Sequence, residues 1–123
     1  MARSDALAVD ILLVDDDEDA VSALSLILEF KGYTVATAGN GKQALDYLEH
    51  NPPPRLIILD LFMPEMDGWS LCEELRRRPD LSNLRVVVVT AFGKAVKVEA
   101  DEILPKPLDV ENLFAVMDRL MPA

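Results

Sequence analysis

The sequence predicts an α/β fold in which a parallel β-sheet is covered by helices on both faces. Short continuous apolar runs alternate along the chain with segments whose apolar residues recur at helical spacing. Such runs, one of them four consecutive valines, are typical of strands buried on both faces. The chain has 123 residues, half of them hydrophobic, which is enough for one core but too few for two. We therefore expect a single domain over residues 1–123.

The first half of the chain predicts two strand–helix units. Ile11–Val14 is the first strand, and the helix that follows spans about residues 18–31, with Gly32 as its stop. Tyr33–Ala38 is the second strand, and a glycine-rich turn leads from it into a short second helix. The prolines at 52–54 end this helix, because proline cannot continue one. The apolar face of the first helix comprises Val21, Leu24, Ile27 and Leu28.

The third strand and the helix after it follow the same pattern. Leu56–Leu59 is the strand, and a loop through Pro64 leads into a helix over about residues 68–78. Asp67 is a suitable N-cap for this helix, because its side chain can accept from the first free backbone N–H groups. Cys72, the single cysteine, falls at helical spacing among leucines, so we expect a buried and unreactive thiol.

Two more strands and a final helix complete the predicted fold. Val86–Val89 is the fourth strand, and Ile103–Pro105 is a brief fifth strand. Asp109 is a suitable cap for the final helix, since its side chain can accept from the first turn. The apolar face of that helix comprises Val110, Leu113, Phe114, Met117 and Leu120.

Charge and hydropathy restrict the partners of the chain. The formal net charge of -10 disfavours a nucleic-acid partner, because such binding depends on Lys and Arg. The basic run Arg76–Arg78 falls at a predicted helix end, where we expect a solvated cluster that the helix dipole favours. The sequence has no apolar run near the ~20 residues of a membrane helix and no secretory signal pattern. We expect a cytoplasmic protein that binds neither nucleic acid nor membranes.

Polar residues stand at the carboxyl ends of four of the predicted strands. Asp15 and Asp16 follow the first strand, and Asp60 follows the third. Thr90 closes the fourth strand, and Lys106 follows the fifth. Because the carboxyl ends of parallel strands share one edge, these residues are expected to meet in a single cleft. Carboxylates brought together repel one another unless a cation lies between them, and hard oxygen ligands suit Mg²⁺.

Each of these residues alone has an ordinary structural explanation. The acidic run that starts at Asp15 is consistent with a solvated helix start, since carboxylates are favoured there. Thr90 is consistent with a hydroxyl that ends a strand, and Lys106 with a surface lysine. Together they supply a hydroxyl donor and an ammonium that face carboxylates, as a phosphoryl group beside Mg²⁺ requires. The combination therefore predicts an acidic metal and phosphoryl site.

Four segments of the chain resemble those of response-regulator receiver domains of two-component signalling, including the chemotaxis regulators. They occur in the family's order, and the similarity covers nearly the whole chain. The resemblance implies a flavodoxin-like three-layer sandwich with a five-stranded parallel sheet of order 2-1-3-4-5. With no output domain after Ala123, we expect a stand-alone receiver that signals through phosphorylation-dependent protein interaction. The four segments are Leu12–Asp16, Leu59–Gly68, Val89–Ala91 and Pro105–Pro107.

The resemblance assigns the phosphoacceptor and the metal ligands. Asp60 is implied to attack the phosphohistidine of a sensor histidine kinase or phosphotransfer protein, forming an aspartyl phosphate. Asp16 is implied to bind Mg²⁺ directly and Asp15 mainly through water, with Asp60 and the backbone carbonyl of Phe62 as further ligands. Mn²⁺ is expected to substitute for Mg²⁺. Asp17 does not match the family's acidic pair.

The remaining site residues also come from the resemblance. Thr90 and the backbone amide of Ala91 are implied to hold phosphoryl oxygens, and Lys106 to pair with the phosphoryl group. The Lys106–Pro107 bond resembles the family's cis peptide. The chemistry is that of a switch that gains and loses its own phosphoryl group, not of an enzyme with a separate substrate. The downstream protein target is not implied by any residue.

Two departures from the family's pattern concern the output of the switch. Ile103 stands where the family usually has Tyr or Phe as a rotameric switch, so aromatic switching is not expected. Thr90 and Lys106 are 16 positions apart, which is shorter than usual for the family. The fourth helix is left with about residues 94–100, and a helix of so few residues is marginal unless packed. We predict that this helix is shortened or irregular.

Phe62 and Phe92 lie two residues after Asp60 and Thr90. At these positions the family's side chains border the path of the hydrolytic water, so two bulky rings predict slow loss of phosphate. The alternative is that the rings only face solvent or pack on each other.

Two other functions are weighed against a phosphorylated switch. The first is a receiver-like protein-binding module that no longer depends on phosphorylation, which the missing aromatic switch and the short helix favour. The second is a small phosphatase with Asp15 as nucleophile and Asp17 as acid. A phosphatase needs a cap or substrate pocket, and the chain has few residues left to build one.

Overall fold

The computed structural model describes residues 8–122, and the other residues of the predicted domain, 1–7 and 123, lie outside this part. In the described part, five parallel strands form one sheet in the order β2-β1-β3-β4-β5. This confirms the predicted flavodoxin-like topology. The strands are β1 (Ile11–Val14), β2 (Val35–Ala38), β3 (Leu56–Asp60), β4 (Arg85–Thr90) and β5 (Glu102–Pro105).

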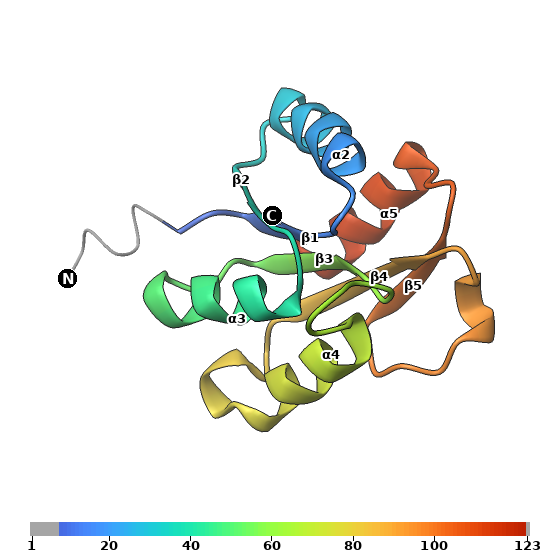
Figure 1. Ribbon diagram of the computed structural model, residues 1–123. Helices are drawn as coiled ribbons and strands as arrows, with labels where there is room; N and C mark the ends of the chain where they lie inside the picture. Colours follow the sequence, from blue (N-terminus) through green and yellow to red (C-terminus); the bar gives the residue numbers. More distant parts are fainter. Residues whose placement is uncertain (1–7, 123) are drawn as a thin grey trace.

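Helices cover both faces of the sheet, as the sequence predicts. Helices α2 and α5 lie on one side of the strands in Figure 1, and α3 and α4 lie on the other. The helices are α2 (Glu18–Phe30), α3 (Gly41–His50), α4 (Gly68–Arg77) and α5 (Val110–Leu120). A 3₁₀ turn, η1 (Pro79–Leu81), follows α4, and a second one, η2 (Gly93–Ala95), follows β4.

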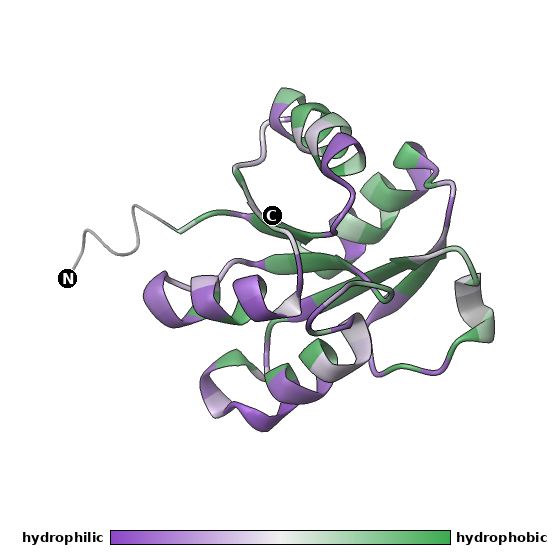
Figure 2. Ribbon diagram, in the orientation of Figure 1, coloured by the Kyte–Doolittle hydropathy of each residue, from purple (hydrophilic) through white to green (hydrophobic). Residues whose placement is uncertain are grey.

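Alternate residues of each strand enter the two halves of the core, since successive side chains point to opposite faces. Leu12 and Val14 of β1 pack with α3 and α4, whereas Ile11 and Leu13 pack with α2 and α5. The strands are green, and therefore hydrophobic, along most of their length in Figure 2. All residues of β1 and β3 are buried, which explains why these strands read as unbroken apolar runs.

Side-chain caps fix the starts of the helices. Asp17 accepts hydrogen bonds from the N–H groups of Asp19 and Ala20 at the start of α2. The predicted caps Asp67 and Asp109 accept in the same way at the starts of α4 and α5. Each cap satisfies backbone donors that lack a partner inside the helix. The start of each helix is thereby fixed beside the end of the preceding strand.

The helix predicted between β4 and β5 is shortened, as expected. Between β4 and β5, a stretch that the structure describes throughout, the only helical element is the 3₁₀ turn Gly93–Ala95. Residues 97–100 have no regular secondary structure. Trp69 of α4 holds this segment through a hydrogen bond of 2.9 Å from its Nε1 to the carbonyl oxygen of Lys97.

Strands β3, β4 and β5 extend one residue beyond the predicted runs at one or both ends, and three further boundaries and one core residue also differ from the prediction. Strand β2 begins at Val35 instead of Tyr33, because Thr34 bonds to the side chain of Asp10. Helices α2 and α4 each end one residue earlier than predicted. Ile27, expected on the core face of α2, is 39% exposed, and Leu28 alone among the described residues of α2 is buried.

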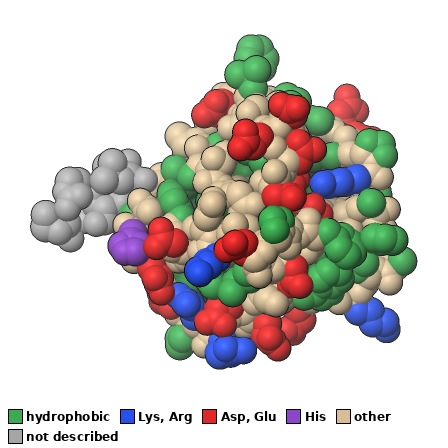
Figure 3. Space-filling view, viewed as in Figure 1, with side chains coloured by type: hydrophobic (Ala, Val, Ile, Leu, Met, Phe, Trp, Pro, Cys, Tyr) green, Lys and Arg blue, Asp and Glu red, His purple; other side chains and the backbone are tan. Residues whose placement is uncertain are grey.

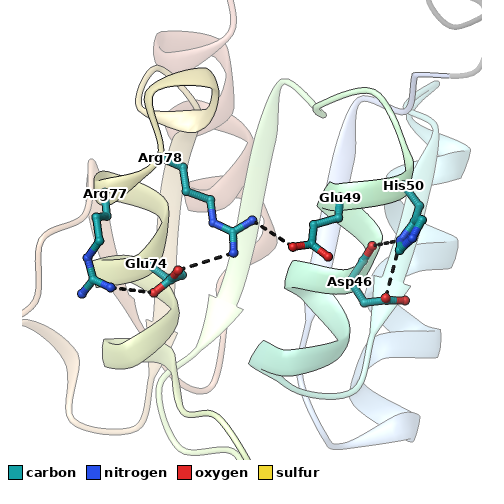
Figure 4. A network of polar contacts seen from close by, with 6 residues as sticks. All are labelled: Asp46, Glu49, His50, Glu74, Arg77 and Arg78. Carbon is teal, nitrogen blue, oxygen red and sulfur yellow. Dashed lines mark hydrogen bonds and ion pairs between the residues drawn. The ribbon is translucent and has the colours of Figure 1, made fainter.

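The predicted solvated cluster Arg76–Arg78 is instead a set of ion pairs. Arg78 contacts Glu49 of α3 at 3.5 Å and Glu74 of α4 at 3.4 Å, and it bridges the two helices in Figure 4. Arg77 pairs with Glu74, and Arg76 lies 3.8 Å from a carboxylate oxygen of Asp101. Carboxylates from three different segments therefore neutralise this run, and it offers no free basic patch.

The surface is otherwise acidic, and red carboxylates are spread over the face shown in Figure 3. This agrees with the formal net charge of -10. Among residues 8–122, the helices are too short or too polar to cross a bilayer.

Candidate functional site

Asp60 is the last residue of β3 and is only 9% exposed. Gly68 fixes the backbone beside it by donating its N–H to the carbonyl oxygen of Leu61 at 2.9 Å. A Cβ atom at position 68 would lie 2.7 Å from the carbonyl oxygen of Asp60 and 2.7 Å from Cα of Leu61. Only glycine fits this close approach of two backbones. No role for Gly68 was predicted, because no local sequence pattern reports how closely α4 approaches the backbone of β3.

Asp15 and Asp16 reach the same place from the end of β1, as predicted. Strands β1 and β3 are neighbours, with Val14 paired to Leu59, so the residues that follow these strands are adjacent. Asp15, Asp16 and Asp60 each offer a carboxylate oxygen, and these atoms lie within 4.8 Å of one another. Asp60 is buried and Asp16 is exposed, so the cluster opens to solvent on the Asp16 side.

Lys106 lies between two of these carboxylates. Its Nζ atom is 3.3 Å from Oδ2 of Asp15 and 3.5 Å from Oδ2 of Asp60. The backbone N–H of Lys106 donates to the carbonyl oxygen of Thr90, which ties β5 to the end of β4. The bond to Pro107 is cis, as the resemblance implied. Partial burial alone would lower the pKa of Lys106, but the charges of Asp15 and Asp60 raise it, so the ammonium stays charged.

Burial raises the pKa of Asp60 above the ordinary value, and the charge of Asp15 adds to this effect. The ammonium of Lys106 and the backbone N–H of Phe62 act in the opposite direction. Asp60 is thus a carboxylate that is poorly solvated and only partly compensated by its neighbours. Such a group gains from a further cation placed beside it.

The three carboxylates fit a Mg²⁺ ion. They supply hard oxygen donors from two strand ends, and the exposed side of the cluster leaves room for the waters that Mg²⁺ keeps. Their one close cation in the described part of the chain, Lys106, contacts only Asp15 and Asp60. Asp16 therefore remains available to a metal.

Thr90 and Ala91 lie at the same edge, as predicted. Thr90 ends β4 next to β3, where Asp60 is paired with Val89. Its side chain is fully buried, and its Oγ1 accepts from the N–H of Phe92 at 3.4 Å. Ala91, in contrast, is exposed. Thr90 is thus buried at the carboxyl end of β4, and Ala91 follows it at the surface.

Phe62, Phe92 and Trp69 form an aromatic cluster, defined by these three rings, at the rim of the site. The ring centroids of Phe62 and Phe92 are 5.3 Å apart, and those of Phe62 and Trp69 are 5.1 Å apart. Phe62 and Phe92 are 49% and 60% exposed. The rings pack on each other, which is the alternative to a water gate, and slow loss of phosphate stays a prediction.

Asp17 is the N-cap of α2. Its Oδ1 is engaged by two N–H groups at the start of α2, whereas its own N–H donates to Oδ1 of Asp15. Asp17 thus has a structural explanation as a helix cap, and the acid that the phosphatase hypothesis needs is engaged elsewhere.

Known proteins share this arrangement. Residues 11–118 match the model of the response regulator receiver domain family. The chain is 37% identical over 121 residues to the response regulator MprA from Mycobacterium sp. (strain KMS), covering 94% of this chain and 51% of that protein. The chain thus spans about half the length of this curated relative.

Solved structures agree with the sequence relatives. The signal receiver domain of a histidine kinase from Syntrophus aciditrophicus superposes with a TM-score of 0.85 at 34% identity, covering 93% of this chain and 90% of that one. The response regulator TrrA from Thermotoga maritima, solved in complex with Mg²⁺-BeF, has a TM-score of 0.81 at 28% identity, with 90% and 97% covered. On these matches and on its acidic cleft, the chain belongs to the response regulator receiver domain family.

Proposed function

We propose that Asp60 accepts a phosphoryl group from a histidine kinase or histidine phosphotransfer protein, and that the modified chain signals by changing its affinity for another protein. The observation that carries this proposal is the position of the Lys106 ammonium, between Asp15 and the buried Asp60. A carboxylate that is short of compensating charge and open on one side is suited to react with an electrophilic phosphorus.

The proposed step transfers one phosphoryl group between two proteins. A carboxylate oxygen of Asp60 forms a bond to phosphorus as the bond between phosphorus and the donor's histidine nitrogen breaks. The electron pair of that bond stays on the imidazole, which takes up a proton. Lys106 pairs with the transferred oxygens, and Thr90 and the amide of Ala91 donate hydrogen bonds to them.

Asp15, Asp16, Asp60 and the carbonyl of Phe62 are proposed to hold the Mg²⁺ ion that members of this family bind. A bound Mg²⁺ supplies positive charge that offsets the oxygens of the phosphoryl group. Mn²⁺, which prefers the same oxygen donors, is proposed to replace it. The structural neighbour TrrA was solved in complex with Mg²⁺-BeF, which supports the binding of a metal here.

The change caused by phosphorylation is proposed to be read by another protein that contacts the segment between β4 and β5. Phosphorylation changes the charge at Asp60 and so can bias the neighbouring loops between two arrangements. Ile103 is partly buried against the α3 and α4 side of the core, so aromatic switching is not part of the proposal. We assign the chain no turnover of a separate substrate, and we place it in the cytoplasm, where ATP-dependent kinases supply the donor.

Intact mass after incubation with Mg²⁺ and acetyl phosphate tests the proposal. The wild type should gain the mass of one phosphoryl group, and Asp60→Asn should gain none. Addition of EDTA should prevent the gain in the wild type. A folded wild type that binds Mg²⁺ and gains no mass from acetyl phosphate or from a phosphorylated phosphotransfer protein would favour the phosphorylation-independent binding module.

A further inference from the structure

A cavity of about 330 Å³ lies between α2, the sheet and the start of α5. Its floor is made by Leu13, Ile58 and Val89, which belong to the half of the core that packs on α2 and α5. Ala23 and Leu24 line the α2 side, and Leu108 lies at the α5 side. The volume is within the range of small-molecule sites, which begins at about 300 Å³.

On the α2 side the cavity is lined by two alanines together with the larger Val21, Leu24 and Ile27. Ala20 and Ala23, which line the cavity, are too small to fill it. The larger apolar residues Leu26 and Phe30 are 69% and 94% exposed and do not line the cavity. Only Leu28 among the described residues of α2 is buried, so the helix covers this part of the core incompletely. An apolar space of this size remains accessible to a ligand.

One end of the cavity is polar and mostly acidic. Asp15, Asp17 and Asp60 contribute three carboxylates to its lining, and Lys106 contributes one ammonium. The whole chain has a formal net charge of -10. A negatively charged ligand would therefore be repelled both at this end and on approach, whereas a positively charged one would be attracted. The cavity thus combines an apolar body with an end suited to a cation.

We propose that this cavity binds a compact apolar molecule that carries one basic nitrogen, such as an arylalkyl amine. The apolar part lies against Leu13, Ile58 and Val89, and the protonated nitrogen faces the carboxylates beside Lys106. Burial of the apolar part supplies most of the affinity, and the charge selects among ligands of equal size. The polar end of the site includes Asp60, the proposed phosphoacceptor, so the proposal concerns the unphosphorylated protein.

Isothermal titration of the unphosphorylated protein with three indoles tests the proposal. Tryptamine, 3-methylindole and indole-3-acetate share the ring and differ in charge. We expect saturable one-to-one binding of tryptamine. The affinity for 3-methylindole should be about tenfold lower than that for tryptamine, and the affinity for indole-3-acetate should be the lowest of the three. Neither Mg²⁺ nor a phosphodonor is present, so the outcome is independent of the proposed phosphoryl transfer.

Two alanine-to-leucine variants locate the binding. Ala23→Leu fills the cavity and should weaken tryptamine binding at least about tenfold, whereas Ala115→Leu adds the same side chain at an exposed position of α5 outside the cavity. Ala20→Leu fills the cavity from a second position if Ala23→Leu does not fold. The proposal is overturned if wild-type protein binds no tryptamine, if the filled variants bind it as tightly as wild type, or if indole-3-acetate binds as tightly as tryptamine.

Discussion

The ammonium of Lys106 lies 3.5 Å from the carboxylate of Asp60, and the same nitrogen contacts Asp15 at 3.3 Å. One cation thus holds together two carboxylates that come from different strands. Asp60 nevertheless keeps a raised pKa, because burial outweighs the ammonium and the charge of Asp15 adds to burial. The site is therefore electrostatically strained before any metal or phosphoryl group is bound, and this strain leads to measurable effects.

Replacement of Asp60 by asparagine should stabilise the metal-free protein at neutral pH. A folded-state pKa above the unfolded value contributes stability that is present below the unfolded pKa and is lost as pH rises through the folded pKa. Asparagine carries no charge at any pH, so the Asp60→Asn protein does not lose this stability. Its free energy of unfolding at pH 7 should exceed that of wild type by more than about 0.5 kcal/mol.

Urea denaturation with EDTA at pH 7 and pH 3 measures this difference. The gain should disappear at pH 3, where Asp60 is protonated in both states. Asp118→Asn removes an exposed charge on α5 and should change stability by less than about 0.5 kcal/mol. A gain of equal size in Asp118→Asn would mean that net charge, not burial, is responsible.

Mg²⁺ should raise the melting temperature of the wild type in a concentration-dependent way. A ligand that binds only the folded state stabilises it by about 2.7 kcal/mol at a hundred times its Kd. Asp16→Asn should abolish most of this increase, since Asp16 is the carboxylate of the cluster that Lys106 does not contact. Differential scanning fluorimetry with and without EDTA provides the measurement. An unchanged Mg²⁺ response in Asp16→Asn contradicts the proposed ligand set.

Gly68→Ala should destabilise the fold by about 2 kcal/mol or more, because its Cβ would meet backbone atoms that cannot move without shifting Asp60. Gly39→Ala is the matched control. Its Cβ would meet only the side chain of Gln43, at 3.1 Å from Oε1; rotation of that side chain breaks the hydrogen bond from the Gly39 N–H, so a smaller loss of about 1 kcal/mol is expected. Chemical denaturation of both variants tests the difference, and equal losses would argue against a backbone constraint at Gly68.

Cys72 should be unreactive in the native protein. Its side chain is 2% exposed, and burial raises the pKa of its thiol to about 11. Ellman's reagent at pH 8 should label no thiol in the native state and one thiol in 6 M guanidinium. Because the unfolded thiol ionises near pH 8.5, this group should also lower stability as pH rises from about 9 to 11. Rapid labelling of native protein would show that α4 opens readily.

Trp69→Phe should loosen the segment between β4 and β5. The substitution keeps an aromatic ring beside Phe62 but removes the hydrogen bond to the carbonyl oxygen of Lys97. Hydrogen exchange of residues 96–100 should accelerate, while exchange in β1 and β3 should not change. The cost in stability should be about 1 kcal/mol, typical of one hydrogen bond. Unchanged exchange at 96–100 would mean that other contacts hold the segment.

The strands, and the meeting of Asp15, Asp60 and Lys106 at one edge of the sheet, were predictable from local apolar runs and from the topology that these runs imply. Unbroken apolar runs located β1, β3 and β4, and the rule that parallel strands share a carboxyl edge brought Asp15, Asp60 and Lys106 together. Helix starts were also predictable, since Asp67 and Asp109 cap through their own side chains.

The predictions failed where distant residues decide the outcome. Arg76 was expected to be solvated, but Asp101, which is remote in sequence, lies beside it. The role of Gly68 depends on how closely α4 approaches the backbone of β3, which no local pattern reports. Ile27 was placed on the core face, but α2 lies over the sheet so that this side chain stays partly in solvent.

The connection between β4 and β5 has a mechanical consequence. It contains a single 3₁₀ turn in its fully described length, and its far end is fastened where Asp101 accepts from the backbone N–H of Val86 at 2.7 Å. A full helix in this place could shift along the sheet and so absorb a displacement of the end of β4. This connection is short, and Trp69 holds it at Lys97. A small movement of Thr90 is therefore expected to shift Trp69 and with it the surface of α4.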